Sequence, residues 1–168
     1  MTQECPYEYR YTGRLRNIPI FSSLTDNRES LERVAAKLKK QSHVAGSAII
    51  SEGDEGDTLY ILNSGRVRIL RNTLSGEPFA LVNLDADQNI FFGEVALIDH
   101  DVRSATVLAV SDCETLTLSR KDYLSLCEED PVAGFRITFQ LALRLSATMR
   151  KSSRDMITMY QALIDEIS

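Results

Sequence analysis

The sequence predicts a mainly β domain with flanking helices, built as an antiparallel sandwich or a jelly-roll barrel. Six of the eight glycines fall between Gly46 and Gly93, where they separate short runs of branched and aromatic residues. After Ser119 the apolar residues change to three- and four-residue spacing, which is typical of helices. A hydrophobic content of 43% and a charged content of 26% are ordinary for a globular chain of 168 residues.

The chain begins with residues 1–20, which we expect to form an irregular N-terminal arm that either packs on the domain or stays mobile. A helix should begin near Thr25 or Asp26, since both are good N-cap residues, and should end near 38–40. Its apolar side chains follow helical spacing: Leu31, Val34, Ala35 and Leu38.

Strands are expected wherever branched and aromatic residues cluster between turns. The expected strands are 48–50, 59–62, 67–70, 79–82, 105–110 and 114–118. The segments 63–65 and 74–78 have the composition of hairpin turns. We therefore assign residues 21–130 to a β domain, which closes with a short helix over 120–128.

A long helix is predicted from Pro131 to the end of the chain, with a length of about 50 Å. Its first half should cover the β domain, and its second half needs a partner. Residues 131–168 are thus interpreted as a lid, and 135–167 as a homodimer interface. The apolar stripe consists of Phe135, Phe139, Ala142, Leu145, Met149, Met156, Met159, Leu163 and Ile167.

The composition argues against several classes of protein. The net charge of −5 does not favour nucleic acid, no apolar run has the length of a membrane span, and the three scattered cysteines fit a reducing cytoplasm. With only His43 and His100, the sequence offers no metal-ligand cluster, and it has no nucleophile–base motif. We expect a cytoplasmic protein that is not an enzyme, holds no cofactor, and binds neither nucleic acid nor membrane.

The segment 91–97, followed by Arg103 and Ser104, carries the most specific chemistry. It combines a backbone turn, the Glu94 carboxylate and the Arg103 guanidinium. Such groups can hold a small cyclic phosphate ester, with the amides and Arg103 on the phosphate and Glu94 on a sugar hydroxyl. A structural Glu94–Arg103 ion pair is the simpler reading, as is a surface pair between Arg103 and the aspartates of 99–101.

This segment resembles the phosphate-binding cassette of the cyclic nucleotide-binding domain family, which includes the catabolite activator protein and the regulatory subunits of cyclic-AMP-dependent protein kinase. Residues 53–61 are similar to that family's first turn and strand, and 64–67 to its next hairpin. The resemblance covers about 21–150. It implies an antiparallel jelly-roll (double-stranded β-helix) barrel with an N-terminal helix and a long C-terminal helix. It also suggests a stand-alone domain, because no helix-turn-helix fits before Ser168.

The resemblance implies that Glu94 accepts a hydrogen bond from the ribose 2′-hydroxyl and that Arg103 binds the phosphate. Ser104 and the Ala105 amide would complete the phosphate shell, although Ser104 could be a plain strand-edge serine. Thr148 would bond the adenine 6-amino group, unless it simply faces solvent. The base would rest on Ile69, Leu81 and Val82, which are core residues by default. The full expected ligand set is Phe92, Gly93, Glu94, Val95, Arg103, Ser104, Ala105, Ile69, Leu81, Val82 and Thr148.

The expected function is a signalling module that binds cyclic AMP in preference to cyclic GMP and repositions its C-terminal helix. Two departures from the family pattern support an alternative. Val102 stands where members often have proline, and 84–93 lacks the usual glycine and is about two residues longer, with Asn89 expected to be left-handed. The alternative is a degenerate fold that binds no nucleotide and serves as a dimerising interaction module. A DNA-binding regulator is disfavoured by length and charge, and the sequence does not identify the downstream partner.

Overall fold

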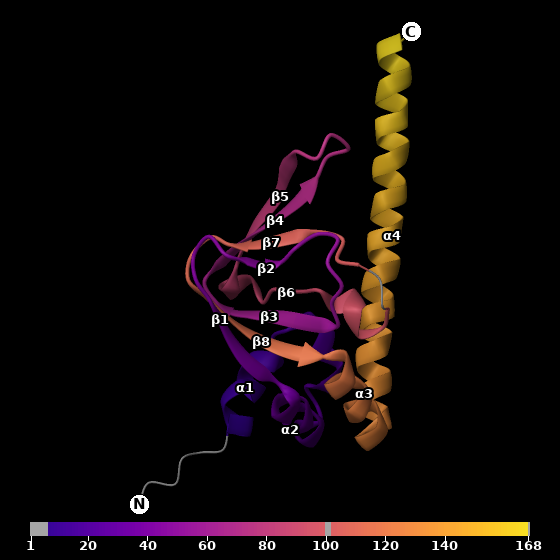
Figure 1. Cartoon of the computed structure of the whole chain (residues 1–168). Helices are drawn as coiled ribbons and strands as arrows, with labels where there is room; N and C mark the ends of the chain where they lie inside the picture. The colour runs from indigo at the N-terminus through magenta and orange to yellow at the C-terminus, as the bar shows by residue number, and fades with distance from the viewer. Residues whose placement is uncertain (1–6, 100–101, 168) are drawn as a thin grey trace, which may run out of the picture.

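The structure is a computed structural model that describes residues 7–99 and 102–167 (Figure 1). Four α-helices and three short 3-10 helices are described with eight strands in these two ranges. The helices are α1 Tyr7–Leu15, η1 Pro19–Leu24, α2 Arg28–Lys37, η2 Ala86–Gln88, η3 Glu94–Leu97, α3 Arg120–Glu129 and α4 Pro131–Ile167. The strands are β1 Lys39–His43, β2 Ala48–Ile50, β3 Thr58–Ser64, β4 Arg66–Asn72, β5 Pro78–Asp85, β6 Phe91–Phe92, β7 Thr106–Ala109 and β8 Cys113–Ser119.

The strands form two four-stranded antiparallel sheets, with orders β1-β8-β3-β6 and β2-β7-β4-β5. This is the antiparallel jelly-roll barrel with flanking helices that the resemblance implies, and the fold class is confirmed. The 74–78 turn closes the β4–β5 hairpin as expected. The prediction of a hairpin turn at 63–65 is wrong, because this turn joins β3 of one sheet to β4 of the other.

Two strands were not expected. The helix expected to end near 38–40 overlaps the start of β1, which instead pairs with β8 from Lys39↔Thr117 to His43↔Cys113. Its side chains are mostly exposed and polar, so the backbone pairing alone defines this strand. The short strand β6 pairs with β3 and leads directly into the 93–97 turn.

The N-terminal segment that the structure describes is ordered and helical rather than irregular. Helix α1 places Tyr11 and Leu15 in the main hydrophobic core, where Ile18 follows them. Helix α2 begins one to two residues later than expected, because Asn27 is its N-cap and accepts a hydrogen bond from the Ser30 N–H at 3.1 Å. The N-terminal part of the chain therefore packs under the barrel.

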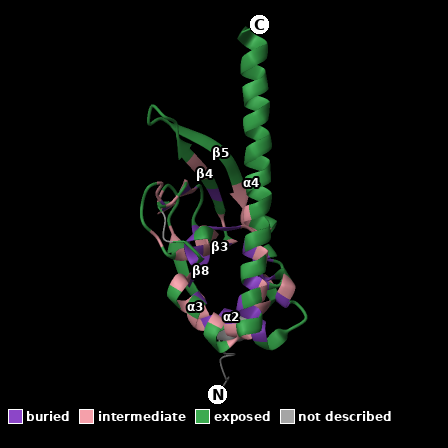
Figure 2. Ribbon diagram, turned by 90° about the vertical axis from the view of Figure 1, so that its right-hand side faces the viewer, coloured by how far each residue is buried: buried purple, intermediate pink, exposed green. Residues whose placement is uncertain are grey.

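Helix α4 has two different halves (Figure 2). Ala133, Ile137 and Leu141 are buried in the main core, together with residues of α1, α2 and α3. Beyond Leu141 every residue of the helix is exposed except the half-buried Leu145. The 37-residue helix continues away from the barrel (Figure 1), and about 55 Å of helix results. Within the described ranges, no helix has both the length and the apolar character needed to cross a membrane.

Candidate ligand-binding site

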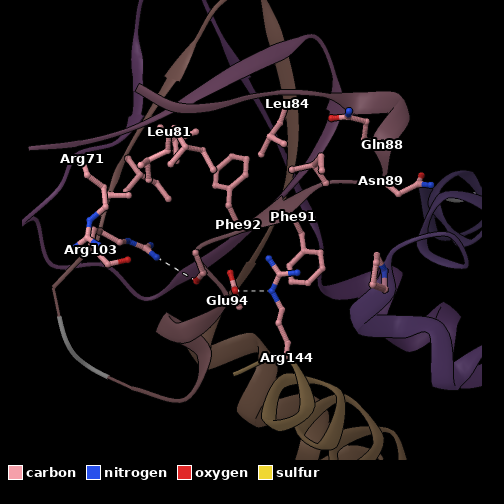
Figure 3. A pocket seen from close by; sticks show the side chains of 18 residues that line it. Arg71, Leu81, Leu84, Gln88, Asn89, Phe91, Phe92, Glu94, Arg103 and Arg144 are labelled. Carbon is pink, nitrogen blue, oxygen red and sulfur yellow. Dashed lines mark hydrogen bonds and ion pairs between the residues drawn. The ribbon is translucent and has the colours of Figure 1, made fainter. Parts of the chain in front are cut away.

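A cavity of about 470 Å³ opens on the barrel beside the start of the exposed half of α4 (Figure 3). One wall is apolar and comes from strands of both sheets. The opposite wall is polar and comes from the 93–94 turn, the 103–105 segment and α4. The lining residues are Pro19, Ile50, Ile69, Arg71, Leu81, Leu84, Gln88, Asn89, Ile90, Phe91, Phe92, Gly93, Glu94, Arg103, Ser104, Ala105, Val107 and Arg144.

Gly93 makes the turn that brings Glu94 to this cavity. Its φ of 73° lies in the left-handed region that favours glycine, and it precedes the 3-10 helix η3. A Cβ at this position would lie 2.8 Å from the Arg103 Nη1 atom and 2.9 Å from the Thr58 carbonyl oxygen. The residue type therefore sets both the backbone turn and the close approach of Arg103.

Arg103 is held from both its backbone and its side chain. Its N–H donates to the Asp54 carbonyl at 2.8 Å, and its carbonyl accepts from the Gly53 N–H at 2.9 Å. The guanidinium donates to the Thr58 carbonyl at 2.8 Å and to the Gly93 carbonyl at 3.3 Å. Burial lowers the pKa of Arg103, and this effect is opposed by the nearby Tyr60 and Asp57.

The sequence offered two simpler explanations of Arg103: an ion pair with Glu94, or a surface ion pair with the aspartates of 99–101. The alternative of a Glu94–Arg103 ion pair is wrong, because Glu94 pairs with another arginine and the described hydrogen bonds of the Arg103 guanidinium go to backbone carbonyls. A pair between Arg103 and Asp101 falls outside the described residues.

Glu94 accepts a hydrogen bond from Nε of Arg144 on α4, at 2.9 Å. The Glu94 side chain is only 16% exposed, whereas that of Arg144 is 47% exposed. The Arg144 guanidinium also lies 4.4 Å from the centre of the Phe91 ring, within the range of a cation–π contact. One arginine thus ties the long helix to the carboxylate of the cavity.

The apolar wall is more open than expected. Leu81 is 50% exposed and Val82 is 44% exposed, so the expectation that they are core residues by default is wrong. Ile69 is half-buried, and with Leu81 it lines the cavity, while Val82 does not. Phe92 is buried and stacks on Tyr60 with 5.5 Å between the ring centres.

Two other residues of the expected ligand set lie outside this cavity. Val95 is 41% exposed on η3 and is not among the lining residues. Thr148 lies one turn beyond Arg144 and lines a separate open groove between α4 and the β4–β5 hairpin. Arg71 and Leu81 line both the cavity and the groove, so the two are contiguous.

Several lining residues were not expected. Arg144 is one of them, because it lies 50 residues from Glu94 in the sequence. Gln88 and Asn89 come from the longer segment that departs from the family pattern, and Asn89 is left-handed with a φ of 56°, as expected. The extra length of this segment was the one feature of the sequence that could have indicated a different cavity wall here.

No group of three or more histidine, cysteine or acidic side chains arranged to hold a metal occurs among the described residues. His43 lies on β1, where its Nε2 is 2.9 Å from the Thr115 hydroxyl, and burial lowers the pKa of its imidazole. His100 lies outside the described residues.

Comparisons with known proteins agree with this geometry. Residues 40–130 match the family described as "Cyclic nucleotide-binding domain". The Cyclic AMP receptor protein of Thermus thermophilus is 34% identical over 131 residues, 78% of this chain and 59% of that protein. A cAMP-dependent protein kinase regulatory subunit of Hypocrea atroviridis is 36% identical over 124 residues, 74% of this chain and 24% of that protein.

Among solved structures, the Catabolite Activator Protein of Thermus thermophilus superimposes with a TM-score of 0.73 at 31% identity. That match covers 84% of this chain and 62% of the solved chain. The chain thus spans only about three fifths and one quarter of the two curated relatives. Because the family match extends over more than half of the residues, the chain belongs to the cyclic nucleotide-binding domain family.

Proposed function

We propose that this chain binds a cyclic nucleotide, cyclic AMP in preference to cyclic GMP, and that binding repositions α4. The observation that carries the proposal is the arrangement of the cavity. A carboxylate, a guanidinium, an exposed serine and a left-handed glycine turn line one side, and an open apolar wall lines the other. Within the proposed organisation, 21–130 form the binding domain and 131–168 form the lid.

The cyclic phosphate would lie against Arg103, Ser104 and the Ala105 amide. Arg103 suits this role because a guanidinium keeps its charge and presents several donors in one plane. Two of its hydrogen bonds already go to the backbone carbonyls of Gly93 and Thr58, so the group is oriented before a ligand arrives. Glu94 would then accept from the ribose 2′-hydroxyl.

The base would pass over Ile69 and Leu81 toward the groove that contains Thr148. Because Leu81 lines both the cavity and the groove, a purine lying on it extends from one into the other. A threonine hydroxyl accepts a hydrogen bond from the adenine 6-amino group, and this favours cyclic AMP. The names of two relatives, a cyclic AMP receptor protein and a cAMP-dependent kinase regulatory subunit, support the same preference.

The Glu94–Arg144 ion pair offers a route from ligand to helix. A ribose hydroxyl on Glu94 competes with Arg144 for the same carboxylate, so occupancy changes the contact that ties α4 to the cavity. The ligand shifts the helix only as far as the two helix positions differ in ligand affinity. Homodimerisation through 135–167, in the cytoplasm, would transmit the change to a protein partner.

The alternative is an interaction module that keeps the fold and binds no nucleotide. It is favoured by the apolar side chains that α4 exposes, among them Phe135 at 68%, Met149 at 70% and Ile167 at 78%. Contiguous apolar surface of this kind usually meets another protein. The interface and the nucleotide site are compatible, so only a ligand measurement separates the two functions.

Thermal unfolding with cyclic AMP, cyclic GMP and 5′-AMP tests the proposal. A ligand at 100 times its Kd adds about 2.7 kcal/mol, which raises the midpoint by about 5–10 °C in a domain of this size. Arg103→Ala and Ser104→Ala should abolish or reduce the rise. Arg68→Ala is the matched control, because Arg68 is exposed and bonds Asn83 away from the cavity. If millimolar nucleotide does not raise the unfolding midpoint, the proposed function fails and the interaction module is the function that remains.

A further inference from the structure

The far end of the cavity is built by a short turn, residues 85–89, which we call the wall turn. Figure 3 shows Gln88 and Asn89 on the side of the view away from Arg103. Both residues line the cavity, as do Ile90 and Phe91, which follow immediately. The position of this turn therefore sets the shape of one cavity wall.

The wall turn has a defined internal structure. Asp85 and Gln88 form a capping box, in which the Gln88 side chain accepts from the Asp85 N–H at 3.0 Å. The Asn89 N–H donates to the Ala86 carbonyl at 3.2 Å, and Asn89 is left-handed. These local bonds shape the turn. They leave the Asn89 amide oxygen and the second lone pair of the Ala86 carbonyl to accept hydrogen bonds from elsewhere.

Arg14 of α1 supplies those partners. Its Nη1 donates to Oδ1 of Asn89 at 2.8 Å, and its Nη2 donates to the Leu62 carbonyl at 2.9 Å and to the Ala86 carbonyl. The guanidinium thus bridges the wall turn and strand β3. The turn is also held by the Ala86 N–H, which donates to the Gly65 carbonyl at 3.1 Å, and the next residue, Ile90, accepts from the Leu62 N–H at 3.0 Å. Arg14 comes from 75 residues away, on a helix outside the barrel.

The burial of Arg14 indicates a fixed placement. Its Nε is buried and has no hydrogen-bond partner among the described residues. A buried donor without a partner is costly, so the bonds of the two terminal nitrogens must outweigh that loss. Neighbouring Leu15 is fully buried and anchors the same end of α1 in the core. An arginine that merely lies on the surface would not have a buried Nε without a hydrogen-bond partner.

We infer that Arg14 is a positioning residue for the nucleotide cavity, so that the N-terminal helix is part of the binding machinery. It acts by holding the wall turn against β3 and touches no ligand itself. The identity of the ligand rests on the proposed function, whereas the coupling of α1 to the wall turn does not. The competing explanation is that Arg14 only anchors α1 to the barrel.

Three variants of the full chain separate these explanations. Arg14→Gln removes the charge and the planar set of guanidinium donors, whereas Arg14→Lys keeps the charge but has fewer donors in fixed positions. Arg16→Gln is the matched control, because Arg16 is exposed just beyond the same helix. Two quantities are measured at 25 °C, well below unfolding. They are amide hydrogen exchange at Leu62, Ala86 and Asn89 without ligand, and Kd for cyclic AMP and cyclic GMP by calorimetry.

Loss of one charge-assisted hydrogen bond multiplies the opening equilibrium constant of the wall turn by about ten, so exchange at those amides should be about tenfold faster. The apparent Kd is proportional to one plus this opening constant, so it should rise by the amount that the open fraction from exchange requires. Arg14→Lys should fall between wild type and Arg14→Gln, and Arg16→Gln should match wild type. A purely anchoring role lowers the unfolding midpoint without changing Kd, since the chain remains folded at 25 °C.

Two results overturn the inference: unchanged exchange in Arg14→Gln, or a Kd that stays below the value required by the open fraction that exchange gives. If the wild type binds neither nucleotide, the proposed function fails, and the exchange experiment still decides the coupling. Faster exchange confined to the wall turn would then support Arg14 as the group that holds this wall. Exchange that matches wild type would refute it.

Discussion

Replacing Gly93 with alanine tests whether the cavity depends on the close approach of Arg103. Two separate costs meet at this position. The φ of 73° is unfavourable for any residue with a Cβ, and the new methyl would lie 2.8 Å from Nη1 of Arg103 and 2.9 Å from the Thr58 carbonyl oxygen. The guanidinium would have to move and lose a hydrogen bond to one of its carbonyls.

The chain offers a control for each cost. Gly46 has a φ of 84° and nothing within 4 Å of its added Cβ, so Gly46→Ala introduces the strain alone. A Cβ at Gly56 would overlap the Arg103 guanidinium without the left-handed strain, so Gly56→Ala introduces the displacement alone. The strain costs about 1 kcal/mol. The lost charge-assisted bond costs about 1.5 kcal/mol, the low end of its range because Arg103 is only half-buried.

Gly93→Ala should therefore lower the free energy of unfolding by about 2–3 kcal/mol and the midpoint by about 5–10 °C, against about 2–4 °C for Gly46→Ala. Differential scanning calorimetry measures the midpoints, and calorimetric titration measures cyclic AMP binding. We expect both Gly93→Ala and Gly56→Ala to weaken binding, and Gly46→Ala to leave it unchanged. Equal midpoints for Gly93→Ala and Gly46→Ala would refute the reasoning.

Three further predictions concern the helices. Arg144→Met and Glu94→Gln should show a coupling of about 1 kcal/mol in a double-mutant cycle of urea unfolding, because the two side chains form one part-buried pair. Leu141→Ala should destabilise the protein by about 2–5 kcal/mol in the same assay, since its side chain is 1% exposed. The Ser30 hydroxyl is the main cause of the lowered pKa of Asp130, so this carboxylate stabilises the fold above the unfolded pKa of about 4 and loses that contribution as pH falls below it. Ser30→Ala should make the stability difference between pH 7 and pH 3 smaller.

Each of these has a matched control and a contrary result. Additive effects within about 0.3 kcal/mol would exclude the Arg144 coupling. Leu143→Ala, at a 48% exposed site on the same helix, should change stability little, and an equal loss at both leucines would contradict the packing of α4. Ser22→Ala, at an exposed serine, should keep the full pH dependence. If Ser30→Ala leaves the pH dependence of stability unchanged, the Ser30–Asp130 contact is not the cause of that dependence.

The sequence predicted those parts of the fold that have a strong local pattern. Each of the six expected strands overlaps a strand of the structure, and the helices over 120–128 and from Pro131 are both present. These segments bury apolar side chains at regular intervals, and periodicity reports that burial directly. Strand β1 had no such signal, because Lys39–His43 is polar and depends on its partner β8 for its conformation.

The same limit applies to the cavity. Gly93, Glu94, Arg103 and Ser104 are close in sequence, so one local motif was enough to predict that they line one site. Arg144 reaches Glu94 only through the tertiary packing of α4, and Arg14 reaches the wall turn through the packing of α1. No local pattern carries such contacts, and this is why the sequence offered only Arg103 as an ion-pair partner for Glu94.

The unbroken length of α4 has a geometric consequence. Residues 145–167 follow the Arg144 contact and extend about 35 Å along one rigid axis. A tilt of about 10° at Arg144 would displace the far end by about 6 Å, slightly more than the rise of one helical turn. A small change beside Glu94 would thereby place a different set of side chains against any partner that binds near Ile167. A rigid helix of this length would convert a small rearrangement in the barrel into a large one at a distance.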